Sequence, residues 1–109
     1  MSAIIPKKRF GQHFLRDQNI IRKIIDGAVV SKDDIVLEIG PGLGDMTSLL
    51  SQRAERVIAV ELDRDLCSIL SEKFAEKNVE IISVDALKFD IAGLYERVGR
   101  KIKVVANLP

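Results

Sequence analysis

Three glycines stand within five residues at 40–44, directly after the apolar run 35–39. Glycine adopts backbone conformations that other residues avoid, so this spacing lets the chain turn sharply and approach a ligand closely. The spacing is G-x-G-x-G, whereas the dinucleotide fingerprint G-x-G-x-x-G would need a glycine at Asp45. A phosphate-binding P-loop is disfavoured as well, because no Lys-Ser/Thr pair follows the glycines.

Acidic side chains around this turn favour a cationic ligand over a phosphate. Asp45 follows the last glycine and occupies the place where a pyrophosphate would meet a helix N-terminus. Glu38, just before the glycines, adds a second negative charge. S-adenosylmethionine suits this pattern, because it carries a sulfonium, an ammonium and a carboxylate but no phosphate. A turn that binds no ligand remains the alternative for the glycines alone.

Two more carboxylates follow strand-like runs. Glu61 closes the run 57–61, where it could accept both hydroxyls of a ribose, and Asp85 follows the run 79–84, where it could accept the adenine amino group. Taken singly, Glu61 would be a solvated strand end and Asp85 a turn or cap residue. Their coincidence with the glycine turn at successive strand ends favours a nucleoside cofactor, because open α/β sheets bind ligands there.

The elements that must position these residues alternate along the chain. The β-rich runs begin about 22 residues apart, a spacing that suits strand–helix–strand crossovers and a parallel sheet. Four runs are predicted as strands: 35–39, 57–61, 79–84 and 102–106. Helical patterns cover 18–30, 45–53, 63–77 and, more weakly, 88–99. The fold class is therefore α/β, with a helix before the first strand.

The length and composition of the chain are those of one small domain. The chain has 109 residues, of which 47% are hydrophobic and 30% charged, an ordinary globular mixture. Its one cysteine, Cys67, excludes an intramolecular disulfide and a multi-cysteine metal site, and its apolar neighbours predict a packed thiol. The sequence has neither a signal-peptide pattern nor an apolar run of membrane-spanning length, so we expect a cytoplasmic protein.

Positive charge gathers near the N-terminus. Residues 1–17 hold four basic side chains against Asp17 alone, whereas the other 92 residues hold 13 basic and 15 acidic ones. The basic residues are Lys7, Lys8, Arg9 and Arg16. A local net charge of +3 on one arm indicates an anionic partner, although a solvated arm is the simpler alternative.

Five sequence elements together resemble the ribosomal-RNA adenine dimethyltransferases. They occur in that family's order and spacing: FGQHFL at 10–15, EIGPGLG at 38–44, Glu61, VDAL at 84–87 and NLP at 107–109. The similarity runs from about residue 7 to residue 109, and GQHFL with NLP is its most specific part. GQHFL looks more like the small-subunit branch than like the erythromycin-resistance branch.

The resemblance implies a Rossmann-like S-adenosylmethionine-dependent methyltransferase fold and a role for each matched residue. His13 and Leu15 would close over the cofactor, and the glycine turn, with Gly40 and Gly42, would approach its methionine part. Glu61 would hold the ribose and Asp85 the adenine.

The NLP element would act on the substrate. Asn107 would lie near both the methyl group and the target base. Its side-chain oxygen and the carbonyl of Leu108 or Pro109 would accept the N–H bonds of an adenine amine, so that positioning supplies much of the catalysis without a metal. The base would have to be flipped out or unpaired, and the four basic residues of the arm would contact phosphates of ribosomal RNA in the small subunit.

The chain departs from the family in length, because the family's motif continues beyond NLP. We expect residues 1–16 to form a basic, cofactor-closing arm and residues 17–109 the N-terminal part of the catalytic domain, truncated after the fourth parallel strand. The rest of the sheet and a helical C-terminal RNA-binding domain would be absent. An exposed edge on the strand at 102–106 would favour self-association. Such a fragment would bind the cofactor but methylate poorly.

Two other functions stay open on the sequence alone. One is an S-adenosylmethionine-dependent methyltransferase with a non-RNA substrate, which the basic arm and NLP argue against. The other is a non-catalytic nucleotide-binding or RNA-binding Rossmann module, which cofactor selectivity would reveal.

Overall fold

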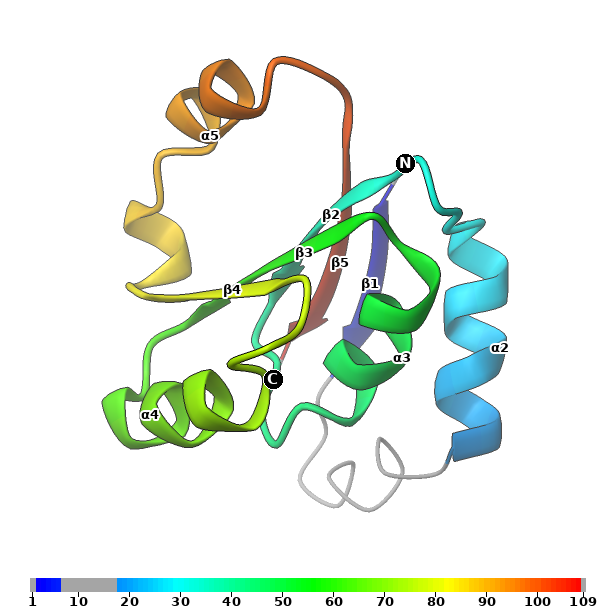
Figure 1. Ribbon diagram of the computed structural model, residues 1–109, viewed down its shortest axis with the longest axis horizontal. Helices are drawn as coiled ribbons and strands as arrows, with labels where there is room; N and C mark the ends of the chain where they lie inside the picture. Colours follow the sequence, from blue (N-terminus) through cyan, green and yellow to red (C-terminus); the bar gives the residue numbers. More distant parts are fainter. Residues whose placement is uncertain (1, 7–17, 109) are drawn as a thin grey trace.

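The computed structural model describes residues 2–6 and 18–108, and side chains from 19 to 106. Its five strands form one parallel sheet in the order β1-β5-β2-β3-β4 (Figure 1). The strands are β1 (Ser2–Pro6), β2 (Ile35–Ile39), β3 (Arg56–Glu61), β4 (Val79–Ser83) and β5 (Ile102–Leu108). The helices are α2 (Gln18–Ala28), α3 (Asp45–Arg53), α4 (Arg64–Lys73) and α5 (Ile91–Val98), with a 3₁₀ turn η1 (Ala86–Lys88) before α5.

The central strands β2 and β3 are nearly continuous apolar runs, as expected for parallel strands covered on both faces. Alternate side chains enter two cores. One core lies between the sheet and helices α2 and α3, and it contains Ile21, Ile25, Val36, Met46, Leu50, Ala54, Val57 and Val105. The other lies beneath α5 and contains Ile35, Leu37, Ile58, Val60, Leu94 and Ile102. The sheet is therefore the middle layer of three.

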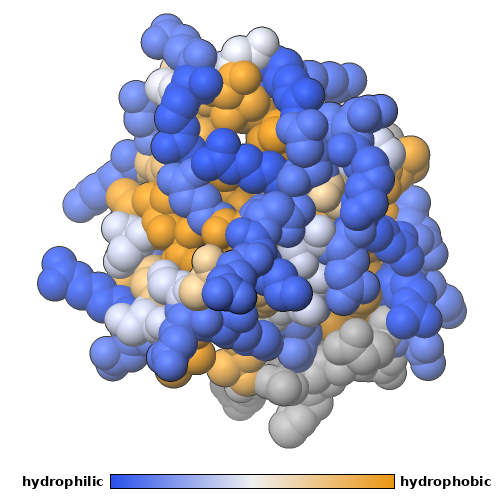
Figure 2. All heavy atoms as spheres, in the orientation of Figure 1, coloured by the Kyte–Doolittle hydropathy of each residue, from blue (hydrophilic) through white to orange (hydrophobic). Residues whose placement is uncertain are grey.

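Hydrophilic residues cover most of the face seen in Figure 2, and hydrophobic residues show between them towards β4, η1 and α5. Within the described residues, no helix is long and apolar enough to cross a membrane.

The predicted strands correspond to β2, β3, β4 and β5, so the parallel α/β architecture is confirmed. Two of the helices end earlier than their sequence patterns predicted. The first, expected to reach residue 30, ends at Ala28, since Val29 adopts a left-handed conformation with φ of 53°. The third, expected over 63–77, ends at Lys73, after which Lys77 N donates to Phe74 O in a tighter turn.

The sequence did not predict β1. Ser2–Pro6 lies parallel to β5, with Ser2 opposite Val104 and Pro6 opposite Leu108. Residues 2–6 of the expected arm thus form a strand, and the β5 edge that we expected to be exposed is paired. Proline in the last position of an edge strand is compatible with this pairing, because it lacks only an N–H donor. Our reason for self-association does not hold in this structure, and self-association itself stays a prediction.

Candidate functional site

The carboxyl ends of β2, β3 and β4 meet at one edge of the sheet, because the three strands are parallel and adjacent. Gly40 follows β2, and its N–H donates to Val60 O at 3.0 Å. Glu61 ends β3, and its carbonyl accepts from Val84 N at 3.0 Å, just before Asp85. The structure therefore brings the glycine turn and the two predicted carboxylates together in strand order.

The strand β5 ends at the same edge on the other side of β2. Its register sets Ala106 opposite Ile39, so the backbone of Asn107 lies level with the start of the glycine turn at Gly40. The backbone of Leu108 follows as the last residue of β5. The side chains of both residues lie outside the described part of the chain, and their predicted roles stay predictions.

All three glycines of the turn have left-handed backbones, with φ of 75° at Gly40, 59° at Gly42 and 89° at Gly44. Gly42 and Gly44 differ in what surrounds them. A Cβ atom on Gly44 would lie 2.8 Å from Leu70 Cδ2 and 3.0 Å from Phe74 Cε2, so this glycine allows α4 to pack against the turn. A Cβ atom on Gly42 would meet nothing within 4 Å. Gly42 therefore borders open space, where a ligand could approach the backbone.

Glu38 does not supply the fixed negative charge that we expected beside the turn. Its side chain is 1% exposed, and one carboxylate oxygen accepts a 2.5 Å hydrogen bond from Thr47 Oγ1 on α3. Burial, opposed by the Thr47 hydrogen bond and reinforced by the negative charge of Glu61, raises the pKa of Glu38 to about 7. Near neutral pH the group is therefore a mixture of the neutral acid and the carboxylate.

Glu61 and Asp85 each make a local backbone hydrogen bond and keep capacity for more. Glu61 Oε2 accepts from Asp63 N at 2.9 Å, and Asp85 Oδ1 accepts from Leu87 N at 2.9 Å, which caps η1. Glu61 and Asp85 therefore also have the local structural roles that the sequence suggested as the alternative, at a strand end and as a cap. A carboxylate offers about four lone-pair sites, so one hydrogen bond leaves room for the hydroxyl or amine groups of a nucleoside.

Sequence reasoning missed two apolar side chains beside these carboxylates. Leu62 directly follows Glu61 and is 66% exposed, and Leu87 lies two residues after Asp85 and is 94% exposed. Leucines in turns, where polar residues are the rule, were the signal that could have found them. Such exposed apolar groups next to hydrogen-bonding carboxylates suit the flat faces and polar edge of a purine.

Several predicted site residues lie outside the described residues. These are His13 and Leu15 of the cofactor-closing segment, the basic residues Lys7, Lys8, Arg9 and Arg16, and Pro109. Within the described residues, no group of three or more His, Cys, Asp or Glu could hold a metal ion.

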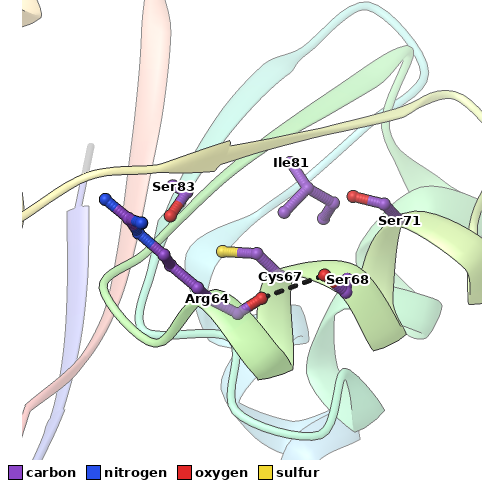
Figure 3. Close-up of a pocket in the computed structure, with 6 residues that line it drawn as sticks. All are labelled: Arg64, Cys67, Ser68, Ser71, Ile81 and Ser83. Carbon is purple, nitrogen blue, oxygen red and sulfur yellow. Dashed lines mark hydrogen bonds between the residues drawn. The ribbon is translucent and has the colours of Figure 1, made fainter.

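A hollow of about 490 Å³ lies between α4 and β4, on the flank of the sheet and not at the glycine turn (Figure 3). It is lined by Arg64, Cys67, Ser68, Ser71, Ile81 and Ser83. The Cys67 thiol is buried and donates to Glu61 O at 3.3 Å, consistent with a packed thiol. Figure 3 shows the Arg64 side chain reaching towards Ser83, at the end of β4.

Comparisons with known proteins match the chain to one family. The family described as ribosomal RNA adenine dimethylase matches residues 5–109. The chain is 50% identical over 105 residues to the ribosomal RNA small subunit methyltransferase A of Alkaliphilus oremlandii, covering 94% of this chain and 37% of that protein. It is 49% identical over 109 residues to the protein of the same name from Aromatoleum aromaticum, covering 100% of this chain and 40% of the relative.

Two solved structures share the fold. The 23S rRNA methyltransferase ErmE superposes with a TM-score of 0.72 at 30% identity, over 85% of this chain and 36% of that one. A dimethyladenosine transferase from Plasmodium falciparum superposes with a TM-score of 0.69 at 33% identity, over 84% of this chain and 32% of that one. The chain thus spans between 32% and 40% of the length of these four proteins.

Proposed function

Because this chain belongs to the ribosomal RNA adenine dimethylase family, we propose that it forms the cofactor-binding part of an S-adenosylmethionine-dependent enzyme that dimethylates N6 of adenines in small-subunit ribosomal RNA. The observation that carries the proposal is the alignment of Gly40, Glu61 and Asp85 at the ends of three adjacent strands. No single one of these residues would distinguish a cofactor site from an ordinary turn.

The residues fit this cofactor better than a dinucleotide. Open space beside Gly42 supports an approach of the methionine part to the backbone, and the carboxylate of Glu61 supports bonding to both ribose hydroxyls. Asp85 would accept the adenine amino group, while Leu62 and Leu87 would cover the purine faces. The carboxylates of Asp45, at the end of the turn, and Glu61, at the end of the neighbouring strand, would repel a pyrophosphate but not a sulfonium. The cofactor supplies the methyl group.

The end of β5 is the proposed substrate side. The Asn107 side-chain oxygen would accept one N–H of the adenine amine, and the carbonyl of Leu108 or Pro109 would accept the other. These bonds would hold the nitrogen in line with the methyl group, which is the main catalytic contribution needed. His13 and Leu15 would close the site from the N-terminal side, and Lys7, Lys8, Arg9 and Arg16 would hold RNA phosphates.

Calorimetric titration tests the cofactor part of this proposal. The folded chain should bind S-adenosylmethionine and not NAD, and Glu61→Ala should weaken binding by about tenfold or more, because a charge-assisted bond to the ribose is lost. Glu76→Ala is the matched control, since this exposed glutamate precedes β4 and so lies near the opposite edge of the sheet. Preference for NAD, or equal effects of the two substitutions, would contradict the proposal.

Methylation tests the substrate part. The assay uses a protein of the relatives' full length that contains this chain, because the present chain spans about two fifths of the length of its relatives. In that protein, Asn107→Ala should abolish methyl transfer to ribosomal RNA while cofactor binding falls much less. Retained methylation by the variant would remove Asn107 from the proposed role.

A further inference from the structure

Glu38 and Thr47 form a buried polar pair directly below the glycine turn. They are 1% and 0% exposed, and they are the buried polar or charged residues among the side chains that the structure describes. Glu38 is on β2, two residues before Gly40, and Thr47 is in the first turn of α3, three residues after Gly44. The Thr47–Glu38 hydrogen bond therefore links the two elements that the glycine turn connects.

The surroundings of Glu38 disfavour a permanent charge. Its neighbours across the sheet are Ala59 on β3 and Val105 on β5, and neither can offset a negative charge. A lone carboxylate in such a place is costly, and the neutral acid is the usual outcome. Burial and the neighbouring Glu61 favour the neutral acid, while the hydrogen bond from the Thr47 hydroxyl favours the carboxylate, and the resulting pKa is about 7.

The charged groups that face Glu38 are few in the described part of the chain. The strand β3 contributes Glu61, and α3 contributes neutral Thr47, with Asp45 two residues earlier at the start of the helix. The residues of α2 in the same core, Ile21 and Ile25, are apolar. Among the described residues, the group that lowers the pKa of Glu38 is the Thr47 hydroxyl and not a cation.

We propose that Glu38 is a positioning residue whose ionisation is coupled to cofactor binding: the buried acid releases its proton when a cationic cofactor occupies the glycine turn. The inference rests on the proposed function, which places a sulfonium and an ammonium there. On binding, the O–H bond of the Glu38 carboxyl breaks, the proton passes to solvent, and the carboxylate is offset by the cofactor's positive charge. The Thr47 hydrogen bond then becomes charge-assisted and stronger, so that α3 is held more tightly to β2.

Proton release gives a definite pH dependence. Because the free form holds a proton that the bound form lacks, cofactor affinity should rise with pH. With the Glu38 pKa at about 7, the rise should approach roughly tenfold per pH unit below pH 6.5 and flatten above pH 7.5. At pH 7 the release should be about half a proton per cofactor bound, since about half of the free protein is protonated there.

Calorimetry of the full chain with S-adenosylmethionine, in two buffers of different ionisation enthalpy, measures this release directly. Titrations at pH 5.5, 6.0, 6.5 and 7.0 avoid the ionisation of the cofactor's own amino group. Glu38→Gln should abolish the release and leave an affinity that does not change with pH. Thr47→Val should increase the release at pH 7, because loss of the hydroxyl donor moves the Glu38 pKa further up.

A second measurement keeps the proposal testable if a variant folds poorly. Carbon-13 NMR of glutamate carboxyl groups in the wild-type chain should show one signal that titrates near pH 7 without cofactor and well below pH 6 with it. The Glu38→Gln spectrum assigns that signal if it folds, and otherwise the conservative Glu38→Asp spectrum does so.

The outcomes separate this inference from the function on which it rests. Cofactor binding without proton release, or equal release in wild type and Glu38→Gln, would overturn the role of Glu38 and leave the proposed function intact. Equal release would also mean that a group other than Glu38 supplies the proton. A folded chain that binds no S-adenosylmethionine would refute the cofactor part of the proposed function and this inference with it.

Discussion

Alanine at Gly44 and alanine at Gly42 should damage the protein in different ways, although the two glycines are two residues apart in the same turn. Both have left-handed backbones, with φ of 89° and 59°. A residue with a Cβ atom in that conformation costs about 1–2 kcal/mol. The entropic gain from replacing glycine in the unfolded chain is the same for both, so it cancels in the comparison.

The difference comes from packing. The new Cβ atom at Gly44 would lie 2.8 Å from Leu70 and 3.0 Å from Phe74. Both side chains are buried in the interior of the fold, so neither can swing into solvent, and such overpacking costs about 1–3 kcal/mol. Gly44→Ala should therefore lower the free energy of unfolding by about 2–5 kcal/mol, and Gly42→Ala, with no atom within 4 Å, by about 1–2 kcal/mol.

Urea unfolding followed by circular dichroism measures the stability, and calorimetric titration with S-adenosylmethionine measures the binding. Gly42→Ala should lose affinity by about tenfold or more while most of the chain stays folded, because its Cβ atom points into the space proposed for the cofactor. Gly44→Ala should unfold earlier but bind nearly as wild type in the fraction that is folded. Equal losses of stability in the two variants, or unchanged affinity in Gly42→Ala, would refute this division between packing and binding.

Four further predictions concern other parts of the molecule. Val29→Gly should raise the free energy of unfolding by about 0.5–1 kcal/mol in urea, because Val29 has φ of 53°, and a loss would count against strain there. Leu87→Ser should weaken S-adenosylmethionine binding by about threefold or more, with an unchanged urea midpoint, since this side chain is 94% exposed. Replacing Lys7 and Lys8 by alanine in the longer protein should reduce the slope of log affinity for ribosomal RNA against log salt by about 1–2; an unchanged slope would exclude phosphate contacts by them. The raised pKa of Glu38 means that its folded form keeps a proton that the unfolded form loses, so its contribution to stability is full below about pH 4.5 and is lost as the pH rises to about 7. The decline in urea midpoint over that range should therefore be smaller in Glu38→Gln.

Local patterns in the sequence were enough to predict the parallel α/β sheet and the strand ends at which the proposed site lies. The alternation of apolar runs and helical stripes depends on contiguous residues, and the glycine turn and Glu61 stand at strand ends that those patterns define. Parallel strands in consecutive units necessarily bring such ends to one edge. The family followed from the spacing of five short elements, each of which can be read in the sequence without knowledge of any long-range contact.

The tertiary structure decided what depends on residues that are distant in the chain. Ser2–Pro6 becomes a strand only through its pairing with β5, about a hundred residues later, and five residues have no periodicity that could predict this. Gly42 and Gly44 look alike in the sequence, and only the approach of α4 gives one a packing role and leaves the other open. Glu38 suggests a charge beside the turn, but the fold buries it against Thr47, and this burial raises its pKa to about 7. The sequence by itself therefore determined which residues stand at the strand ends of the proposed site, whereas packing determined the surroundings of each of them, because burial and electrostatic environment belong to the assembled fold.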